Sequence, residues 1–336
     1  MACCFSSTAS MAWRSWRASY SSAMRFCRFV VWVLSIAFFI GLSSDTFGGD
    51  GGKWTVRTPM PSSRTEVAAV ESGGKIYVIG GFGQGGDLVE EYDPSTNRWR
   101  RRSSLPFPLH HVGAASVGGK IYVIGGFRSG WTPVRTVLEY DPSLDRWRKL
   151  SRMPTERGAL GAAVIGNKIY TVGGIARNRR NTGANEVYDP LKDRWKKRAS
   201  MPTPRDHLAV GVVGGKLYVI GGRIDGSYRK NLAVTEEYDP ASNRWRSRAS
   251  MPTARSGIAA AALGGRIFVF GGESVSGTFN QTESYDPATD RWETLTPMPT
   301  PRHGLGAAVL GGNIYVISGG PRPGGSFSSL NEVFTP

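Results

Sequence analysis

The stretch from Lys216 to Arg255 decides the fold; it reads KLYVIGGRIDGSYRKNLAVTEEYDPASNRWRSRASMPTAR. A short apolar run, Leu217 to Ile220, stops at the glycine pair Gly221-Gly222. A variable loop leads to a second run that ends in Tyr238-Asp239-Pro240, and Trp245 and a Met-Pro-Thr-x-Arg phrase follow. Because nearly the same order of residues recurs along the chain, the repeat has to be interpreted before any single residue.

Six copies of this unit cover residues 54–336. Glycine pairs that end a Tyr-Val-Ile-like run begin at Gly80, Gly125, Gly173, Gly221, Gly271 and Gly319. A tryptophan follows each Tyr-Asp-Pro turn, at Trp99, Trp147, Trp195, Trp245 and Trp292. Trp54 has no such turn before it, and the last unit ends at Phe334-Thr335-Pro336 with no tryptophan after it. The two fragments complete each other, which gives six units.

Each unit predicts four short antiparallel strands. In the quoted copy, Val210–Val213 and Leu217–Ile220 are apolar runs joined by two glycines, a tight-hairpin signal. Thr235–Tyr238 is the third strand, the Asp-Pro pair after it opens a turn, and Trp245 begins the fourth. Six such sheets can bury their faces only against one another. The predicted fold class is therefore all-β, a six-bladed propeller of four-stranded antiparallel blades.

The unit resembles a Kelch repeat: a diglycine after a Tyr-containing strand, then Tyr-Asp-Pro, then Trp, at about 50 residues. The resemblance covers residues 54–336. It implies a β-propeller in which one blade is shared between the two ends of the chain. Trp54 would then supply the outer strand of the blade that ends at Pro336, and Thr335 can replace the usual aspartate because no turn follows it.

Residues 1–44 have the composition of a leader. They contain four arginines and no acid, and residues 29–42 form an apolar run followed by small polar residues. This pattern is typical of a signal peptide, and the run is short for a spanning helix, which needs roughly 20 residues. We expect the secretory pathway, with the protein secreted or membrane-anchored through residues 29–42. An organelle transit peptide is the alternative. Residues 45–53 are expected to be a Gly-rich linker.

Two further features bear on the compartment. All three cysteines precede residue 45, so the propeller needs no disulfide and cysteine usage does not name its redox compartment. Asn280 opens an Asn-Gln-Thr sequon in a variable loop, a candidate N-glycosylation site if the domain enters the secretory pathway.

The leader supplies four of the net charge of +16, and much of the remaining +12 clusters around the repeat tryptophans, on the predicted outermost strand of each blade. One interpretation is that these charges block edge-to-edge strand pairing. The other is a basic perimeter that attracts acidic glycans or lipid head groups. Nucleic acid is not an expected partner, because no nucleic-acid-binding motif accompanies the charge.

The varied loops are predicted to share one face of the propeller, because the uniform Gly-Gly and Asp-Pro turns both belong to the other face. Varied loops on a rigid frame are where binding usually occurs. The loops after the diglycines supply the first candidate binding residues: Arg128, Trp131, Arg135, Arg177, Arg179, Arg180, Arg223, Tyr228 and Arg229. An exposed aromatic residue beside arginines is typical of a binding anchor. The alternative is a side chain folded back onto its own loop.

The Met-Pro-Thr-x-Arg loops supply a second set of candidates. Their arginine recurs in five of the six units, with Leu109 as the exception, which favours blade-to-blade hydrogen bonds, and ligand contact is the alternative. We include Arg205 and Arg302 as candidates, with the four histidines that follow this position: His110, His111, His207 and His303. Glu66 and Asp206 share these positions, so a metal or acid–base site at the channel mouth is the alternative. Against it, the histidines come from alternate blades, which predicts distant Cα atoms, and they lack a metal-ligand spacing. No metal, cofactor or catalytic residue is therefore predicted.

Across both loop sets, fourteen cationic side chains against six acids predict a basic face and an anionic ligand or acidic partner. No nucleophile elbow, Walker loop, zinc motif or dinucleotide fingerprint occurs. The predicted function is a monomeric, non-catalytic scaffold that binds a protein or an acidic glycan at the loop face. The alternative is an exported sugar-modifying enzyme resembling the sialic acid mutarotases of the Kelch family. Galactose-oxidase-like chemistry is disfavoured, since it uses a cysteine and the propeller has none.

Overall fold

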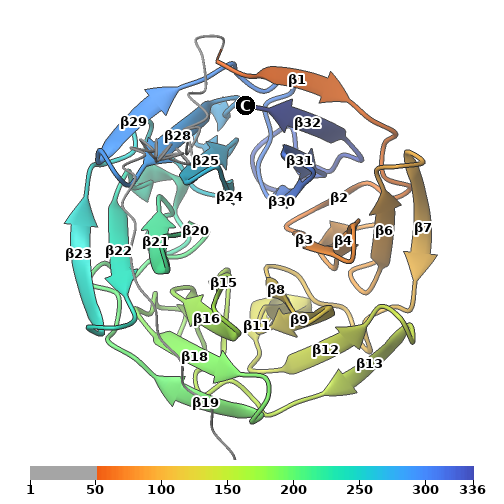
Figure 1. Ribbon diagram of the computed structural model, residues 1–336, viewed down its shortest axis with the longest axis horizontal. Helices are drawn as coiled ribbons and strands as arrows, with labels where there is room; N and C mark the ends of the chain where they lie inside the picture. Colours follow the sequence, from red (N-terminus) through yellow and green to blue (C-terminus); the bar gives the residue numbers. More distant parts are fainter. Residues whose placement is uncertain (1–50) are drawn as a thin grey trace, which may run out of the picture. The chain divides into compact units, whose positions relative to one another are not determined.

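Figure 1 shows the computed structural model, which describes residues 51–336 as six four-stranded antiparallel sheets around a central axis. The predicted all-β, six-bladed propeller is confirmed. The predicted leader and the first part of the predicted linker lie outside the described residues. Within the described residues, no helix has the length and apolar character needed to cross a membrane.

The blades follow one another in sequence, and each of the first five runs from its innermost to its outermost strand. Blade 1 consists of β3 (Ala68–Ser72), β4 (Lys75–Ile79), β6 (Val89–Asp93) and β7 (Arg98–Arg102). Blade 2 consists of β8 (Gly113–Val117), β9 (Lys120–Ile124), β12 (Val137–Asp141) and β13 (Arg146–Lys149). Blade 3 consists of β15 (Gly161–Ile165), β16 (Lys168–Val172), β18 (Asn185–Asp189) and β19 (Arg194–Lys197).

Blade 4 consists of β20 (Ala209–Val213), β21 (Lys216–Ile220), β22 (Thr235–Asp239) and β23 (Arg244–Arg248). Blade 5 consists of β24 (Ala259–Leu263), β25 (Arg266–Phe270), β28 (Thr282–Asp286) and β29 (Arg291–Thr294). Blade 6 joins β30 (Gly306–Leu310), β31 (Asn313–Ile317) and β32 (Asn331–Thr335) to β1 (Lys53–Val56).

Shorter elements lie in the loops, most of them between the second and third strands of a blade, and β2 and β14 before the first strand of one. They are β2 (Arg64–Thr65), β5 (Phe82–Gly83), β10 (Phe127–Arg128), β11 (Thr132–Pro133), β14 (Arg157–Gly158), β17 (Ile175–Ala176), β26 (Glu273–Ser274), β27 (Gly277–Thr278) and the 3-10 turns η1 (Ser129–Trp131) and η2 (Tyr228–Lys230).

Burial explains why the second strand of each blade is a continuous apolar run. Four of the five residues of β21, from Leu217 to Ile220, are buried, because neighbouring blades cover both faces of the sheet. Gly214 and Gly215, with φ of 58° and 73°, make the tight turn between β20 and β21, as the sequence predicted. The outer strand β23 instead exposes Arg244, Arg246 and Ser247, and only Trp245 and Arg248 have intermediate exposure.

The repeat tryptophans fasten each blade to the one before it. Trp245 lies 5.0 Å from Tyr238 between ring centroids, and its Nε1 donates to the carbonyl of Ala199, 2.7 Å away, in the loop after blade 3. The same bond to the preceding blade recurs for Trp99, Trp147, Trp195 and Trp292. Trp54 in β1 makes it too, donating to Thr296 at 2.9 Å, and it stacks at 5.1 Å on Phe334, which stands where the other blades have tyrosine.

The arginine of each Met-Pro-Thr-x-Arg loop forms a buried ion pair within its own blade. Arg205 has no exposed surface, and its Nη1 lies 2.5 Å from a carboxylate oxygen of Glu236 in β22. Its other nitrogens donate to the carbonyls of Val219 and Gly221. The equivalent pairs are Arg64–Glu90, Arg157–Glu186, Arg255–Glu283 and Arg302–Glu332.

This arrangement corrects the expectation that these arginine side chains connect neighbouring blades. The connection is made by the arginine backbone instead: the carbonyl of Arg255 in blade 5 accepts a hydrogen bond from Gly222 of blade 4, 3.0 Å away. The side chain satisfies carbonyls at the end of its own second strand, where the diglycine leaves the ladder. The arginines are therefore part of the frame.

Blade 2 replaces the whole buried network by apolar side chains. Leu109 stands where the other blades have arginine, and Leu138 stands where they have the paired glutamate. Both are almost completely buried in one hydrophobic cluster together with Leu105, which takes the place of the usual methionine. Leu109, the exception noted in the sequence, is therefore accompanied by the loss of the partner glutamate, so that neither charge of the ion pair is present in blade 2.

Candidate functional site

A closed ring of six backbone hydrogen bonds surrounds the propeller axis. Each blade contributes one residue to this ring, the second residue after its arginine (in blade 2, the second after Leu109). The N–H of each ring residue donates to the carbonyl of the ring residue in the preceding blade, over 2.6–3.2 Å. The ring residues are Glu66, His111, Ala159, His207, Gly257 and Gly304. All six have φ between 50° and 64°, the left-handed region that costs a residue with a Cβ more than it costs glycine. The ring therefore fixes three ionisable side chains close to the axis.

A second position in each blade pairs with the residue just after the arginine. It is the first residue after the diglycine, and bridges of this kind join Asp206 to Arg223 and Ser256 to Glu273. In blade 6 the two glycines come one residue late, so Ser318 takes the place of the first glycine with φ of 65°, and Gly320 faces His303. A Cβ at Gly320 would lie 2.6 Å from Cε1 of His303, so this shift leaves room for the imidazole.

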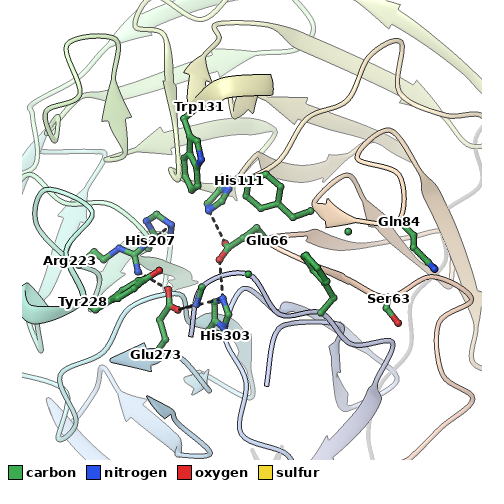
Figure 2. Close-up of a pocket in the computed structure, with 15 residues that line it drawn as sticks. Ser63, Glu66, Gln84, His111, Trp131, His207, Arg223, Tyr228, Glu273 and His303 are labelled. Carbon is green, nitrogen blue, oxygen red and sulfur yellow. Dashed lines mark hydrogen bonds and ion pairs between the residues drawn. The ribbon is translucent and has the colours of Figure 1, made fainter. Parts of the chain in front are cut away.

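Above the ring lies a pocket of about 650 Å³, which Figure 2 shows with its lining side chains. The deep part is polar, since it is lined by the almost completely buried His111, His207, Arg223, Glu273 and His303 together with the half-buried Glu66. The more exposed part is aromatic, with Phe82, Trp131, Tyr228 and Phe327. Concave sites of about 300–1,000 Å³ with convergent polar groups are typical of small-molecule binding.

Arg223 organises one side of the pocket floor. Its Nη1 donates to Glu273 Oε1 at 2.7 Å, its Nη2 donates to His207 Nε2 at 2.8 Å, and its guanidinium lies 4.6 Å over the ring of Tyr228. Because Nε2 of His207 accepts this bond, its proton is placed on Nδ1, which donates to the Asp206 carboxylate. Both ring nitrogens of His207 are therefore occupied by neighbouring side chains.

His303 occupies the other side of the floor and has a different pattern of contacts. Its Nδ1 lies 3.0 Å from the carbonyl of Gly320 and donates to it, which leaves the lone pair on Nε2. This Nε2 lies 3.7 Å from Glu66 Oε1 and 3.5 Å from Glu273 Oε2. The other oxygen of Glu66 lies 3.2 Å from Nε2 of His111. Figure 2 shows these side chains converging on Glu66.

The histidines therefore meet at the axis, and the expectation that alternate blades would keep them apart was wrong. The ring centroids of His111 and His207 are 4.8 Å apart, although the residues come from blades 2 and 4. Blade 3 contributes only Ala159 to the ring between them, so no side chain intervenes. Blade order in the sequence was a poor guide to the distance between these side chains, because the blades are closest to one another at the propeller axis.

Burial sets the charge of two histidines. It lowers the pKa of His111 well below the ordinary histidine value, and the neighbouring His207, His110 and Arg223 lower it further. Burial likewise lowers the pKa of His110 to about 4. For Asp206, burial opposes ionisation, but the hydrogen bond from His207 and the charges around it hold the pKa below its usual range.

We expect the free energy of unfolding to decrease as the pH falls from about 6.5 to about 4. In this window the histidines of the unfolded chain, with pKa values near 6.5, become protonated, whereas His110 and His111 of the folded protein stay neutral. Urea unfolding at several pH values measures the slope. His110→Phe should make this slope shallower, because it removes one of the two groups whose pKa differs between the folded and unfolded chain. The variant should fold, because the phenyl ring can replace the imidazole that lies 3.8 Å from the ring of Phe82. An unchanged slope would show that His110 does not contribute.

The structure brings together part of the predicted candidate set. Trp131, Tyr228, Arg223, His111, His207 and His303 line the pocket, and His110 lies against His111, with Nδ1 atoms 2.6 Å apart. Trp131 is 51% exposed, as an anchor for a ligand would be, yet its ring centroid lies 5.3 Å from that of Phe127 in its own loop. It therefore combines the two predicted alternatives, an exposed anchor and a side chain folded back onto its loop.

The remaining candidates lie outside this pocket. Arg205 and Arg302 are completely buried in their ion pairs, so they present no surface to a ligand there. The exposed residues Arg128, Arg135, Arg177, Arg179, Arg180 and Arg229 do not line it either. Asn280 is half-buried, and Thr282 of its sequon is the buried first residue of β28.

The candidate set omitted the two carboxylates of the floor and two aromatic wall residues, Phe82 and Phe327. The sequence did contain a signal for the carboxylates. Glu66 occupies the same repeat position as His111 and His207, and Glu273 occupies the position after a diglycine that Arg223 holds in the preceding blade. Glu66 was noted at the histidine position without being included among the candidates, and comparing the position after the diglycine would have found Glu273.

The charge count behind the predicted basic face also changes. Five of the fourteen cations are the buried arginines of the frame, each paired with a glutamate that the count omitted. The pocket itself is lined by two carboxylates and one arginine. The exposed arginines of the surrounding loops are what remains of the basic face, and the acidic partner stays a prediction.

Fold and site together define a class of protein: an all-β propeller with repeated blades and a polar pocket at the axial ring. The chain matches the model of the KLHDC2/KLHL20/DRC7 Kelch-repeats domain over residues 50–200 and 159–335. It therefore belongs to the Kelch-repeat family, as the resemblance of its units implied.

Similarity to a solved structure supports the same fold. The structure titled "Structure of YjhT" superposes with a TM-score of 0.75 at 17% sequence identity, covering 84% of this chain and 97% of that one. At this level of identity the similarity concerns the fold alone. Comparison with curated proteins found no match.

Proposed function

We propose that this protein binds a small polar ring compound, of the size of a monosaccharide, in the axial pocket. A Kelch propeller supports a binding scaffold, and the observation that carries the proposal is the pocket itself. Its volume of about 650 Å³, its aromatic walls and its hydrogen-bonding floor suit a molecule with apolar faces and polar edges.

The aromatic wall is held in place before any ligand arrives. Trp131 packs 5.5 Å from Phe82 and 5.0 Å from His111 between ring centroids, yet half of its surface is exposed. Such a ring offers a large apolar contact at a low cost in conformational entropy. On the opposite side, Tyr228 is fixed by the guanidinium of Arg223. A flat ring compound between these walls would direct its hydroxyl groups to the floor.

The rim favours an anionic ligand over a neutral one. Arg128, Arg177, Arg179, Arg180 and Arg229 are exposed in the loops after the diglycines, where they would raise the local concentration of anions. The floor contains Glu66 and Glu273 beside a single arginine, so a carboxylate would be repelled there. We infer that an acidic sugar binds with its carboxylate toward the rim and its hydroxyls toward the floor.

Trp131→Ala is expected to weaken binding of such a ligand at least about tenfold, since it removes the most exposed aromatic contact of the wall. Saturation-transfer NMR with glucuronate, N-acetylneuraminate and glucose, followed by titration calorimetry, measures this. The wild-type protein should prefer the two acids to glucose, and the preference should decline with salt. Arg194→Ala, on the exposed outer strand β19, is the matched surface control. Absence of binding by all three sugars would refute the proposal.

A second candidate is acid–base chemistry on the bound sugar, the enzyme alternative drawn from the sequence. One observation favours it: Nε2 of His303 carries a lone pair and faces two carboxylates at the base of the pocket. Ring opening at a sugar's anomeric carbon requires a base that takes the proton of the anomeric hydroxyl and an acid that gives a proton to the ring oxygen. An imidazole can accept the first proton and, once protonated, return it. NMR exchange between anomers of N-acetylneuraminate distinguishes the candidates, because a binding module leaves the exchange rate unchanged.

The exported location predicted from residues 1–44 is part of this proposal, since an extracellular or luminal compartment contains free and glycan-bound acidic sugars. N-terminal sequencing of the mature protein from a fractionated cell tests it. A mature chain that begins shortly after residue 42 supports cleavage of a signal peptide. A chain that keeps residues 1–44 and remains with the soluble cytosolic fraction contradicts it.

A further inference from the structure

We propose that Glu66, Glu273 and His303 bind a divalent transition-metal ion at the base of the axial pocket. The three residues come from blades 1, 5 and 6 and offer one ligand atom each within 4.8 Å of one another. His303 and Glu273 have side chains only 1% exposed, and Glu66 is 12% exposed, so the atoms face a sheltered space. This inference does not rest on the proposed sugar binding.

The distances fit an ion between the ligand atoms better than direct contacts. Nε2 of His303 is 3.5 Å from Glu273 and 3.7 Å from Glu66, longer than the roughly 2.7–3.2 Å of a hydrogen bond to nitrogen. Metal–ligand bonds of about 2.0–2.1 Å at tetrahedral angles separate neighbouring ligand atoms by about 3.3–3.4 Å. A contraction of a few tenths of an ångström would therefore bring each carboxylate to this separation from His303, and the two carboxylate oxygens lie within 4.8 Å of each other.

The outer contacts of the three ligands are those that metal ligands usually have. Nδ1 of His303 donates to the Gly320 carbonyl, which aims the Nε2 lone pair at the two carboxylates. Glu273 accepts from Arg223 on one oxygen and from the N–H of Gly324, at 3.0 Å, on the oxygen that faces His303. The Glu66 oxygen nearest His303 would lie 2.7 Å from a Cβ at position 304, so Gly304 preserves the space around this ligand.

A second set of residues, Glu66, His111 and His207, also converges, but it is the weaker candidate. Nε2 of His207 already accepts a hydrogen bond from Arg223, and its Nδ1 is bonded to Asp206. A cation there would have to displace the guanidinium from Nε2 of His207. Arg223 also pairs with the far oxygen of Glu273, but Nε2 of His303 accepts no hydrogen bond among the described residues, so the site is assigned to the side of the ring where His303 lies.

The ligand chemistry selects the kind of metal. One imidazole with two carboxylates suits Zn²⁺, Co²⁺, Mn²⁺ or Fe²⁺, whereas Ca²⁺ and Mg²⁺ prefer sites made only of oxygen atoms. An ion held by three protein ligands keeps at least one coordination position open. That position would face the pocket, where a ligand oxygen could reach the ion.

Titration calorimetry of the full-length protein with Zn²⁺, and the visible spectrum with Co²⁺, test the site. We expect one ion per chain and a Co²⁺ spectrum of increased intensity, typical of a tetrahedral or five-coordinate site. Glu273→Gln and His303→Asn should each weaken binding at least about tenfold. Glu66→Gln serves as a second variant, since this side chain is partly exposed and its backbone need not change.

Two controls make the outcome decisive. Asp225→Asn removes a carboxylate from an exposed pair with Lys230 and should leave Zn²⁺ affinity within about twofold. His207→Asn removes the imidazole of the second set and should weaken Zn²⁺ binding much less than His303→Asn does. A Zn²⁺-induced rise in melting temperature, present in the wild type and lost in folded Glu66→Gln, would support the site. Absence of stoichiometric binding, or equal loss in His207→Asn and His303→Asn, would overturn it.

Discussion

Replacing Arg205 with leucine is expected to lower the free energy of unfolding by about 3–5 kcal/mol. The substitution would leave the carboxylate of Glu236 buried without its cation, only 3% exposed, and would free two carbonyl oxygens at the end of β21. Leucine fills most of the space, so the cost is mainly that of the uncompensated charge. Guanidinium unfolding monitored by tryptophan fluorescence measures it.

The double variant Arg205→Leu/Glu236→Leu is expected to recover most of this loss. Blade 2 already contains the equivalent pair, Leu109 and Leu138, both almost completely buried in a hydrophobic cluster. Replacing both partners of a buried ion pair by apolar residues is often close to neutral. The coupling free energy should therefore be at least about 2 kcal/mol. Additive losses in the double variant would show that the pair is not the unit of stability.

Removing β1 is expected to abolish cooperative unfolding of the propeller or to lower its melting temperature severely. β1 pairs with β32 along four residues, and Trp54 contacts Phe334 and Phe270, at 5.1 and 5.7 Å between ring centroids. Without it, blade 6 would lose its outer strand, its bond to the loop after blade 5 would be missing, and the edge of β32 would be open to aggregation. Differential scanning calorimetry and light scattering of a chain that starts after Val56 measure both effects.

Point variants separate the contributions of β1. Trp54→Phe should cost about 1 kcal/mol, since it keeps an aromatic ring on Phe334 but loses the hydrogen bond to Thr296. Trp54→Ala should cost about 2–3 kcal/mol, since the half-buried ring is also lost. If the truncated chain unfolds at the wild-type temperature, closure of the ring by β1 is refuted.

The sequence was sufficient to predict the propeller frame because nearly the same structural residues recur in every blade. The diglycine, the Tyr-Asp-Pro turn and the tryptophan each have one structural role, repeated around the ring, as Tyr238 and Trp245 illustrate. Repetition could not resolve two details. The glycine pair of blade 6 lies one residue late, with Ser318 in the left-handed conformation, and the frame arginine bonds within its own blade.

The site was harder to predict because it depends on convergence at the axis. His111 and His207 are 96 positions apart in the sequence, yet their rings nearly touch, because the blade between them contributes only Ala159 to the ring. Glu273 is bridged to Ser256 of its own blade, and its side chain reaches His303 of the next blade, 3.5 Å away. Neither relation is visible within a single repeat, and both follow from the closed ring of backbone hydrogen bonds.

The central claim is that the blades are a frame and that binding belongs to the axial pocket. Titration calorimetry with glucuronate, comparing wild type, Tyr228→Ala in the pocket and Arg194→Ala on outer strand β19, tests it most directly. The account predicts that Tyr228→Ala loses at least about tenfold in affinity while Arg194→Ala stays within about twofold. Loss of binding in Arg194→Ala with full affinity in Tyr228→Ala would contradict the claim and place recognition on the perimeter.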